Sequence, residues 1–133
     1  MCLSIIAQIP KESKKRVGAK RLSNLTGLHV IKTKFRGETA LHFSVSGGCS
    51  CGFLCKSYDS EAPTWSLNPE HLSKLNKAIS IIDEEADSFL FLAHFIGGEL
   101  PEKEIETTFH ELNSDIENNR IKNNTLYLIK KIS

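Results

Sequence analysis

Signals for membrane insertion and export are missing from this chain of 133 residues. A helix needs roughly 18 consecutive apolar residues to cross a bilayer, and no run approaches that length. The longest run, at 89–98, is interrupted by His94. The first residues carry their charges after the apolar stretch, which is the reverse of a secretory signal. We therefore expect a cytoplasmic protein that makes no membrane contact and whose thiols are reduced.

Motifs that bind nucleotides or exchange disulfides are missing as well. The chain contains neither G-x-x-x-x-G-K-S/T nor G-x-G-x-x-G, so the common phosphate-binding loops are not indicated. It contains no C-x-x-C pair, the usual redox motif. No internal repeat and no long linker divides the chain. With 40% hydrophobic and 25% charged residues the composition is ordinary, and residues 1–133 are expected to form a single domain.

The order of the predicted elements indicates an α+β fold. Short apolar or alternating runs predict strands, whereas apolar residues at helical spacing predict amphipathic helices. Strands are expected at 3–9, 28–35, 39–46, 88–96 and 125–132, helices at 69–86 and 102–118, and a broken helix or loop at 11–27. This order favours a two-layer sandwich, with a mixed sheet of about five strands and two main helices mostly on one face.

Local signals support several of these elements. Gly37 can supply the positive φ that a tight hairpin needs between two of the strands. The Asn-Pro-Glu run at 68–70 is a strong helix start, because asparagine caps, proline fits the first turn and glutamate opposes the helix dipole. The Pro-Glu pair at 101–102 predicts a second helix start. Residues 88–96 are apolar on both faces, as is typical of a central strand.

The most unusual stretch is SGGCSCGFLC at 46–55, which holds three of the four cysteines. Three interpretations of this stretch stay open. In the first, Cys49, Cys51 and Cys55 bind a metal ion such as zinc, with Cys2 as a further ligand, because zinc favours thiolates. The irregular spacing, without two separated pairs, makes this signal weak.

The second interpretation is a reactive thiol at Cys49 or Cys51. The glycines before them can expose backbone N–H groups that form an anion-binding nest, which would lower the pKa of a thiol. His42 or His94 would then serve as the base. In the third interpretation the small residues only fill a tight bend, because cysteine also packs as a small hydrophobic residue.

Two similar sequences place histidines near this stretch. HFSVSGG at 42–48 and HFIGG at 94–98 both end a predicted strand with two glycines. If these strands are parallel and adjacent, both glycine pairs emerge at one edge of the sheet, where ligands commonly bind in α/β sheets. His42 is also expected on the strand face opposite to Leu41 and Phe43.

Charge is unevenly distributed, although the formal net charge is only +1. Residues 1–56 hold ten Lys/Arg against two Asp/Glu, whereas residues 57–117 hold three against fourteen. One segment is a candidate surface for nucleic acid or an acidic partner, through Lys11, Lys14, Lys15, Arg16, Lys20 and Arg21. No aromatic residue lies among them, so stacking on bases is not indicated.

Two classes of function follow from these observations. The favoured class is a non-enzymatic interaction protein that binds another macromolecule, most simply a protein, through a charged face. The alternative is a thiol- or metal-dependent activity centred on the Cys49/Cys51/Cys55 loop. The sequence names no substrate and no reaction for either class.

Overall fold

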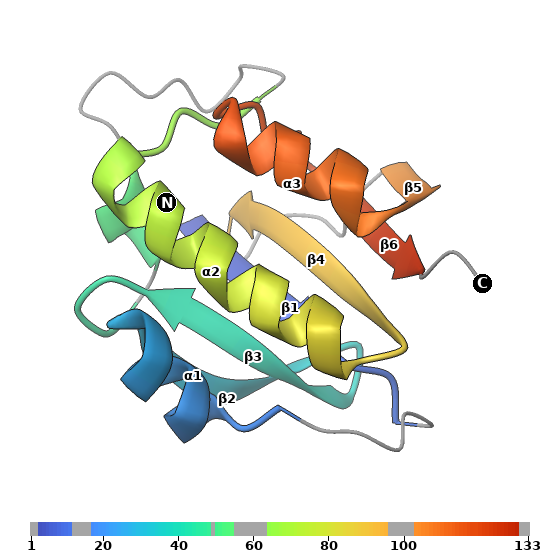
Figure 1. The fold of residues 1–133 in the computed structure, drawn as a ribbon, viewed down its shortest axis with the longest axis horizontal. Coiled ribbons are helices and arrows are strands. Elements are labelled where there is room, and N and C mark those ends of the chain that lie inside the picture. Colours follow the sequence, from blue (N-terminus) through green and yellow to red (C-terminus); the bar gives the residue numbers. More distant parts are fainter. Residues whose placement is uncertain (1–2, 12–16, 49, 55–63, 96–102, 131–133) are drawn as a thin grey trace.

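The computed structural model describes residues 3–11, 17–48, 50–54, 64–95 and 103–130 (Figure 1). Its elements are β1 (Leu3–Gln8), α1 (Ala19–Thr26), β2 (His29–Phe35), β3 (Glu38–Ser44), the 3₁₀ helix η1 (Ser50–Phe53), α2 (Pro69–Glu85), β4 (Ser88–Phe95), β5 (Lys103–Thr107), α3 (Phe109–Glu117) and β6 (Thr125–Lys130). The described strands form one mixed sheet in the order β2-β3-β1-β4-β6-β5, in which β5 and β6 are the only neighbouring strands that pair in parallel. The predicted α+β sandwich is confirmed, with six strands where about five were expected.

The middle of the sheet consists of β1 and β4, whose sequences are apolar on both faces. All six residues of β1 are buried. On β4, Phe89 and Phe91 belong to the core under the helices, whereas Leu92 belongs to an apolar cluster on the opposite face. Burial on both faces removes the need for polar alternation, which is why these strands are recognisable as short apolar runs.

β2 and β3 form the predicted hairpin. Its two-residue turn consists of Arg36, with a φ of 51°, and Gly37, with a φ of 81°. Tight hairpin turns require this left-handed backbone at both positions, so the interpretation of Gly37 is confirmed. Among the described strands, β2 has a neighbour on one side only and is therefore an edge strand of the sheet.

α2 begins where the sequence predicts it. The side-chain oxygen of Asn68 accepts a hydrogen bond of 3.0 Å from the backbone N–H of Glu70, and proline occupies the first turn. Its buried face consists of Leu72, Leu75, Ala78, Ile79 and Ile82. Figure 1 shows α2 lying across the sheet, with α1 and α3 on the same face. Of the helices in the described part of the chain, none has the length and apolarity needed to span a membrane.

The predicted helix at 102–118 is wrong in its first half. Residues Lys103–Thr107 form β5, and only Phe109–Glu117 are helical. Ile105 fits both a helical spacing and the alternation of an edge strand, so periodicity alone did not separate the two. The helix is capped by Thr108, whose hydroxyl accepts from the N–H of Glu111 at 3.4 Å. The predicted start at 101–102 lies outside the described residues.

A second apolar cluster lies on the face of the sheet away from the helices. It consists of Ile6, Phe35, Ala40, Leu92 and Leu126. The hairpin turn reaches toward it, because Arg36 donates to Glu104 Oε1 on the opposite edge strand at 3.2 Å, and Gln8 Nε2 donates to the Phe35 carbonyl oxygen at 2.9 Å. Strand twist accumulates across a sheet. The sheet therefore curls, without closing, until an ion pair joins the β2–β3 turn to the edge strand β5.

Candidate functional site

Residues 50–54 of the cysteine-rich stretch, which include η1, pack at one end of the sheet and act as a wedge between β1 and β3. The backbone N–H of Ile5 donates to Ser50 Oγ at 2.9 Å, and the Ser50 hydroxyl donates to the carbonyl oxygen of Phe43. Ile5 and Phe43 are paired in the register of β1 and β3. Ser50 has no exposed surface. Its hydroxyl therefore bridges the two strands at a point where a side chain replaces the direct backbone contact.

Cys51 continues this wedge. Its Sγ accepts from the backbone N–H of Leu3 at 3.2 Å, and its half-buried side chain packs against the main core. A Cβ at Gly52 would lie 3.0 Å from Val45 Cβ, so this close approach requires glycine. Three cysteines of the candidate site lie outside the described residues: Cys2, Cys49 and Cys55. The shared sulfur site stays a prediction, while the contacts of Cys51 with Leu3 and the core described above are those of a packing residue.

His42 lies beside this wedge, on the strand face expected from the sequence. It is buried, and its Nε2 lies 3.4 Å from Ser50 Oγ. Its Nδ1 has no hydrogen-bond partner among the described residues. Ser50 is fully buried and donates its hydrogen to a backbone carbonyl, so this pair is not a nucleophile and base open to a substrate. Burial, together with the nearby His29, lowers the pKa of His42.

His94 lies on β4 and is paired with Ser4 of β1. The sequence interpretation required the strands of His42 and His94 to be both parallel and adjacent. β3 and β4 are parallel, but they are not adjacent, because β1 lies between them. Gly97 and Gly98 are outside the described residues. His94 is half-buried, and burial lowers its pKa. Within the described ranges, no group of three His, Cys, Asp or Glu side chains is placed to hold a metal ion.

The two histidines predict acid sensitivity of the fold. Both have a pKa below the ordinary value of 6.5 in the folded state, so the unfolded chain takes up protons first. Their contribution to stability is full above about pH 6.5 and is lost as the pH falls through the window between 6.5 and the lowered pKa values.

Urea unfolding midpoints measured at several pH values should therefore decrease on acidification. The His42→Gln/His94→Gln variant should show a flatter dependence, with a substitution of exposed His110, His110→Gln on α3, as the control. An equal slope in all three proteins would contradict this explanation.

The basic segment of the sequence is described only in part. Three of its residues lie outside the described ranges: Lys14, Lys15 and Arg16. Lys11 and Lys20 are exposed. Arg21 forms an ion pair with Glu85 of α2, and this hydrogen bond raises the pKa of the guanidinium. The charge of Arg21 is therefore compensated within the molecule, whereas Lys20 has no ionic partner among the described residues.

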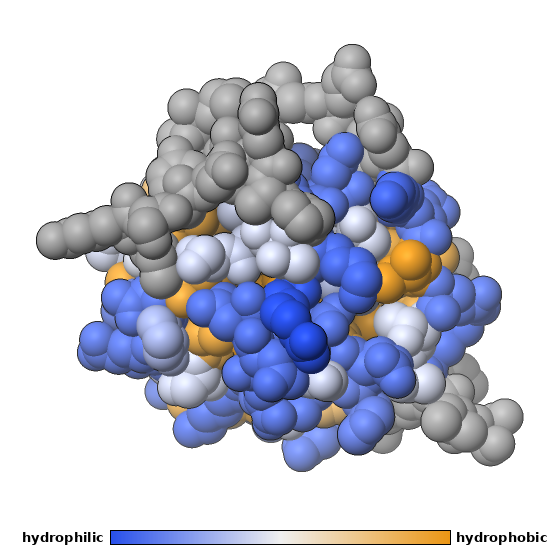
Figure 2. Space-filling model, turned by 90° about the horizontal axis from the view of Figure 1, so that it is seen from above, coloured by the Kyte–Doolittle hydropathy of each residue, from blue (hydrophilic) through white to orange (hydrophobic). Residues whose placement is uncertain are grey.

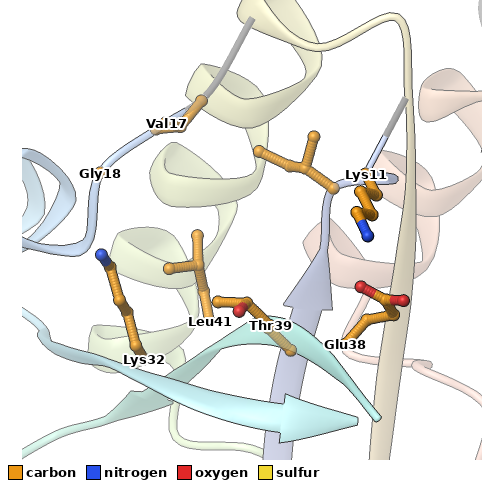
Figure 3. A pocket seen from close by; sticks show the side chains of 9 residues that line it. Lys11, Val17, Gly18, Lys32, Glu38, Thr39 and Leu41 are labelled. Carbon is orange, nitrogen blue, oxygen red and sulfur yellow. The ribbon is translucent and has the colours of Figure 1, made fainter. Parts of the chain in front are cut away.

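A pocket of about 430 Å³ opens where β1 and β3 separate (Figure 3). The ladder between these strands ends at the pair Ala7 and Leu41. The pocket is lined by Ile9, Lys11, Val17, Gly18, Lys32, Glu38, Thr39, Ala40 and Leu41. In Figure 3 the Lys32 side chain extends toward Gly18, and Glu38 points toward Lys11. The pocket is thus lined by apolar residues together with charged side chains of both signs, from Lys11, Lys32 and Glu38.

Lys32 and Lys34 of β2 are candidate binding residues that the sequence interpretation missed. Both are exposed, and neither has an ionic partner in the part of the chain that the structure describes. They flank Thr33, so that lysines recur at every second position of this strand, and this alternation was the local indication that one face of the strand is polar. We call the surface of Lys11, Lys20, Lys32 and Lys34 the basic edge.

The opposite edge of the sheet is acidic, but its charges are compensated. Glu104 is paired with Arg36, and Glu106 is paired with Lys130. Asp115 of α3 is paired with Lys122 at 2.9 Å and also accepts from the hydroxyl of Tyr127 at 2.8 Å. Glu104 and Glu106 are therefore neutralised by partners, whereas Lys20, Lys32 and Lys34 of the basic edge have no ionic partner among the described residues.

No protein family, curated protein or solved structure that was compared with this chain matches it. Its function therefore has to be argued from the geometry and charge of its own residues. The basic edge and the neighbouring pocket combine exposed lysine side chains with a cavity.

Proposed function

We propose that this chain is a cytoplasmic, non-enzymatic interaction domain, and that its basic edge binds an acidic segment of a partner protein. One observation carries the proposal. Lys20, Lys32 and Lys34 have no acidic partner among the described residues, whereas the acids of the opposite edge are paired. Cations without partners on one side of a molecule attract an anionic surface and accelerate its association.

The surface around these lysines favours an acidic protein over nucleic acid. Single-stranded nucleic acids are usually held by stacking their bases on exposed aromatic rings. Each described aromatic side chain is buried or half-buried. Away from these lysines, on the side of the molecule seen from above, Figure 2 shows hydrophilic residues over most of the described surface, with apolar residues in separate patches. Among the described large hydrophobic side chains, only Leu25 and Ile31 are exposed, at 44% and 42%. Recognition by charge is therefore supported better than recognition by stacking or by a broad apolar surface.

The thiol- or metal-dependent alternative has less support. Ser50 and Cys51 make contacts that hold the ends of β1 and β3, and these contacts need no chemistry to explain them. The proposal for Cys49 and Cys55 stays untested. It predicts that zinc or a thiol reagent binds stoichiometrically to the folded protein, which thiol titration and metal analysis under reducing conditions measure directly.

Binding of polyglutamate tests the proposed function. The protein should bind polyglutamate at low salt and release it as salt rises, because screening weakens attraction between exposed charges. The Lys32→Glu/Lys34→Glu variant should bind at least about fivefold more weakly, since each exposed ion pair contributes roughly 0.2–1 kcal/mol and reversal adds repulsion. Fluorescence anisotropy of labelled polyglutamate measures both effects.

A matched control separates local charge from net charge. Lys74→Glu/Lys77→Glu makes the same change of net charge on α2 and should retain most of the binding. Equal losses in both double variants would show that the basic edge has no special role. Absence of polyglutamate binding at low salt would overturn the proposal, and binding of single-stranded oligothymidine alone would replace the protein partner with nucleic acid.

A further inference from the structure

The backbone of β2 shows which of its groups point away from the sheet. The N–H of Val30 donates to Ser23 Oγ of α1 at 2.9 Å, and the Ser23 hydroxyl donates back to the Val30 carbonyl oxygen at 3.4 Å. Val30 is paired with Phe43, but its own polar groups are used outside the sheet. The pair of Val30 and Phe43 is therefore a non-hydrogen-bonded pair of the antiparallel ladder.

This observation fixes the direction of the following residues. In an antiparallel ladder, hydrogen-bonded and non-hydrogen-bonded pairs alternate. Ile31 and Thr33 therefore direct their N–H and C=O groups toward β3, whereas Lys32 and Lys34 direct theirs outward. The two-residue turn agrees, because its closing pair, Phe35 and Glu38, is hydrogen-bonded in this geometry.

Ser23 covers the outward groups of Val30 only. In the described part of the chain, no side chain makes a comparable pair of bonds to Lys32 or Lys34. Both residues are exposed, and their side chains lie on the face that carries the pocket. β2 thus offers a strand edge with outward backbone groups and two lysine side chains at the same two residues.

We propose that an extended, acidic segment of another protein adds to this edge as a further strand, antiparallel to β2. The inference rests on the proposed function and specifies how the acidic partner is held. Backbone bonds to Lys32 and Lys34 would supply affinity, and side chains at alternate positions would supply specificity. Directly opposite residues lie about 4.5–5.5 Å apart at Cβ on one face. The partner therefore carries acidic residues opposite Lys32 and Lys34 and a β-branched or apolar residue between them, next to exposed Ile31 and half-buried Thr33.

The same lysines argue against a second copy of this chain as the occupant. Antiparallel pairing of two β2 strands would bring their lysine side chains together, and like charges directly opposite each other are destabilising. Lysine on an edge strand is a common means of preventing such self-pairing. An acidic strand would be attracted by the same lysines. They therefore disfavour pairing between two copies of β2 and favour pairing with the proposed acidic partner.

The peptide Val-Glu-Val-Glu-Val-Glu-Val, blocked at both ends, provides a probe. In the proposed register two of the glutamates lie opposite Lys32 and Lys34 and exchange backbone bonds with them, whereas the valine N–H groups point away. N-methylation of the glutamates should weaken binding at least about tenfold, because two backbone N–H donors to β2 are lost, each worth roughly 1 kcal/mol. N-methylation of the valines should leave the affinity within about threefold.

Amide hydrogen exchange identifies the strand that is used. In the protein alone, the amides of Lys32 and Lys34 should exchange faster than those of Ile31 and Thr33, and saturating peptide should protect the two lysine amides. Equal affinities of the two methylated peptides, or unchanged exchange at Lys32 and Lys34, would overturn strand addition. If the unmodified peptide still binds in a salt-dependent way, the acidic partner survives that result. If neither this peptide nor polyglutamate binds, the proposed function itself is wrong.

Discussion

Replacement of Trp65 by alanine is expected to lower the free energy of unfolding by about 3–5 kcal/mol, the range for large aromatic residues removed from a core. Trp65 is 2% exposed, and its indole N–H donates to the carbonyl oxygen of Ala93 at 3.1 Å. The pairing of β6 with β4 ends at Leu92 and Leu126. The indole N–H therefore hydrogen-bonds to the Ala93 carbonyl oxygen just beyond the end of this pairing. The change therefore creates a cavity and also removes a donor.

Two further variants separate these effects. Trp65→Phe keeps most of the ring volume but loses the N–H, and a carbonyl left without a donor costs roughly 1–3 kcal/mol. Leu25→Ala removes an exposed side chain and should have little effect. Urea unfolding followed by far-UV circular dichroism measures all three. An unchanged midpoint for Trp65→Ala would show that this ring is not part of the core.

Replacement of Ser50 by alanine is expected to cost about 2–4 kcal/mol, which is more than one ordinary hydrogen bond contributes. Alanine is a small change in volume, but it removes the hydroxyl that accepts from the N–H of Ile5 and donates to the carbonyl of Phe43. Ser50 is fully buried, so water does not readily replace the hydroxyl. Two buried backbone groups would then be left without partners, and each costs roughly 1–3 kcal/mol.

Ser46→Ala is the matched control, because Ser46 is exposed in the same connection after β3. It should change the unfolding midpoint little. Amide exchange adds local information, since the Ile5 amide should lose protection in Ser50→Ala alone. Equal stability of the two variants would mean that the 3₁₀ helix does not act as a wedge between the strands.

Elements with strong local signals could be predicted from the sequence. The apolar run of β1, the Gly37 turn and the asparagine cap of α2 each act within a few residues, so one sequence contains the whole signal. β5 was missed because Ile105 fits two periods, and Thr108 with Glu111 carried the signal that the helix begins later.

The candidate site was predicted less well, because it depends on strand order. Cysteines and histidines were singled out from their spacing, yet β1 separates the strands that carry His42 and His94. Lys32 and Lys34 were overlooked because the alternation of their strand indicates a polar face but does not show that the strand lies at the edge of the sheet. Their importance appears only once β2 is known to have a single neighbour.

By itself the sequence determined the fold class, the hairpin, α2 and the uneven distribution of charge. The tertiary structure alone decided which charges remain without partners. Arg36 and Glu104 are distant in sequence and meet only because the sheet curls, whereas Lys32 and Lys34 remain open because their strand lies at the end of the order. The physical reason is range: caps and turns act between near neighbours, while strand order and charge pairing depend on contacts between distant segments that the whole core selects together.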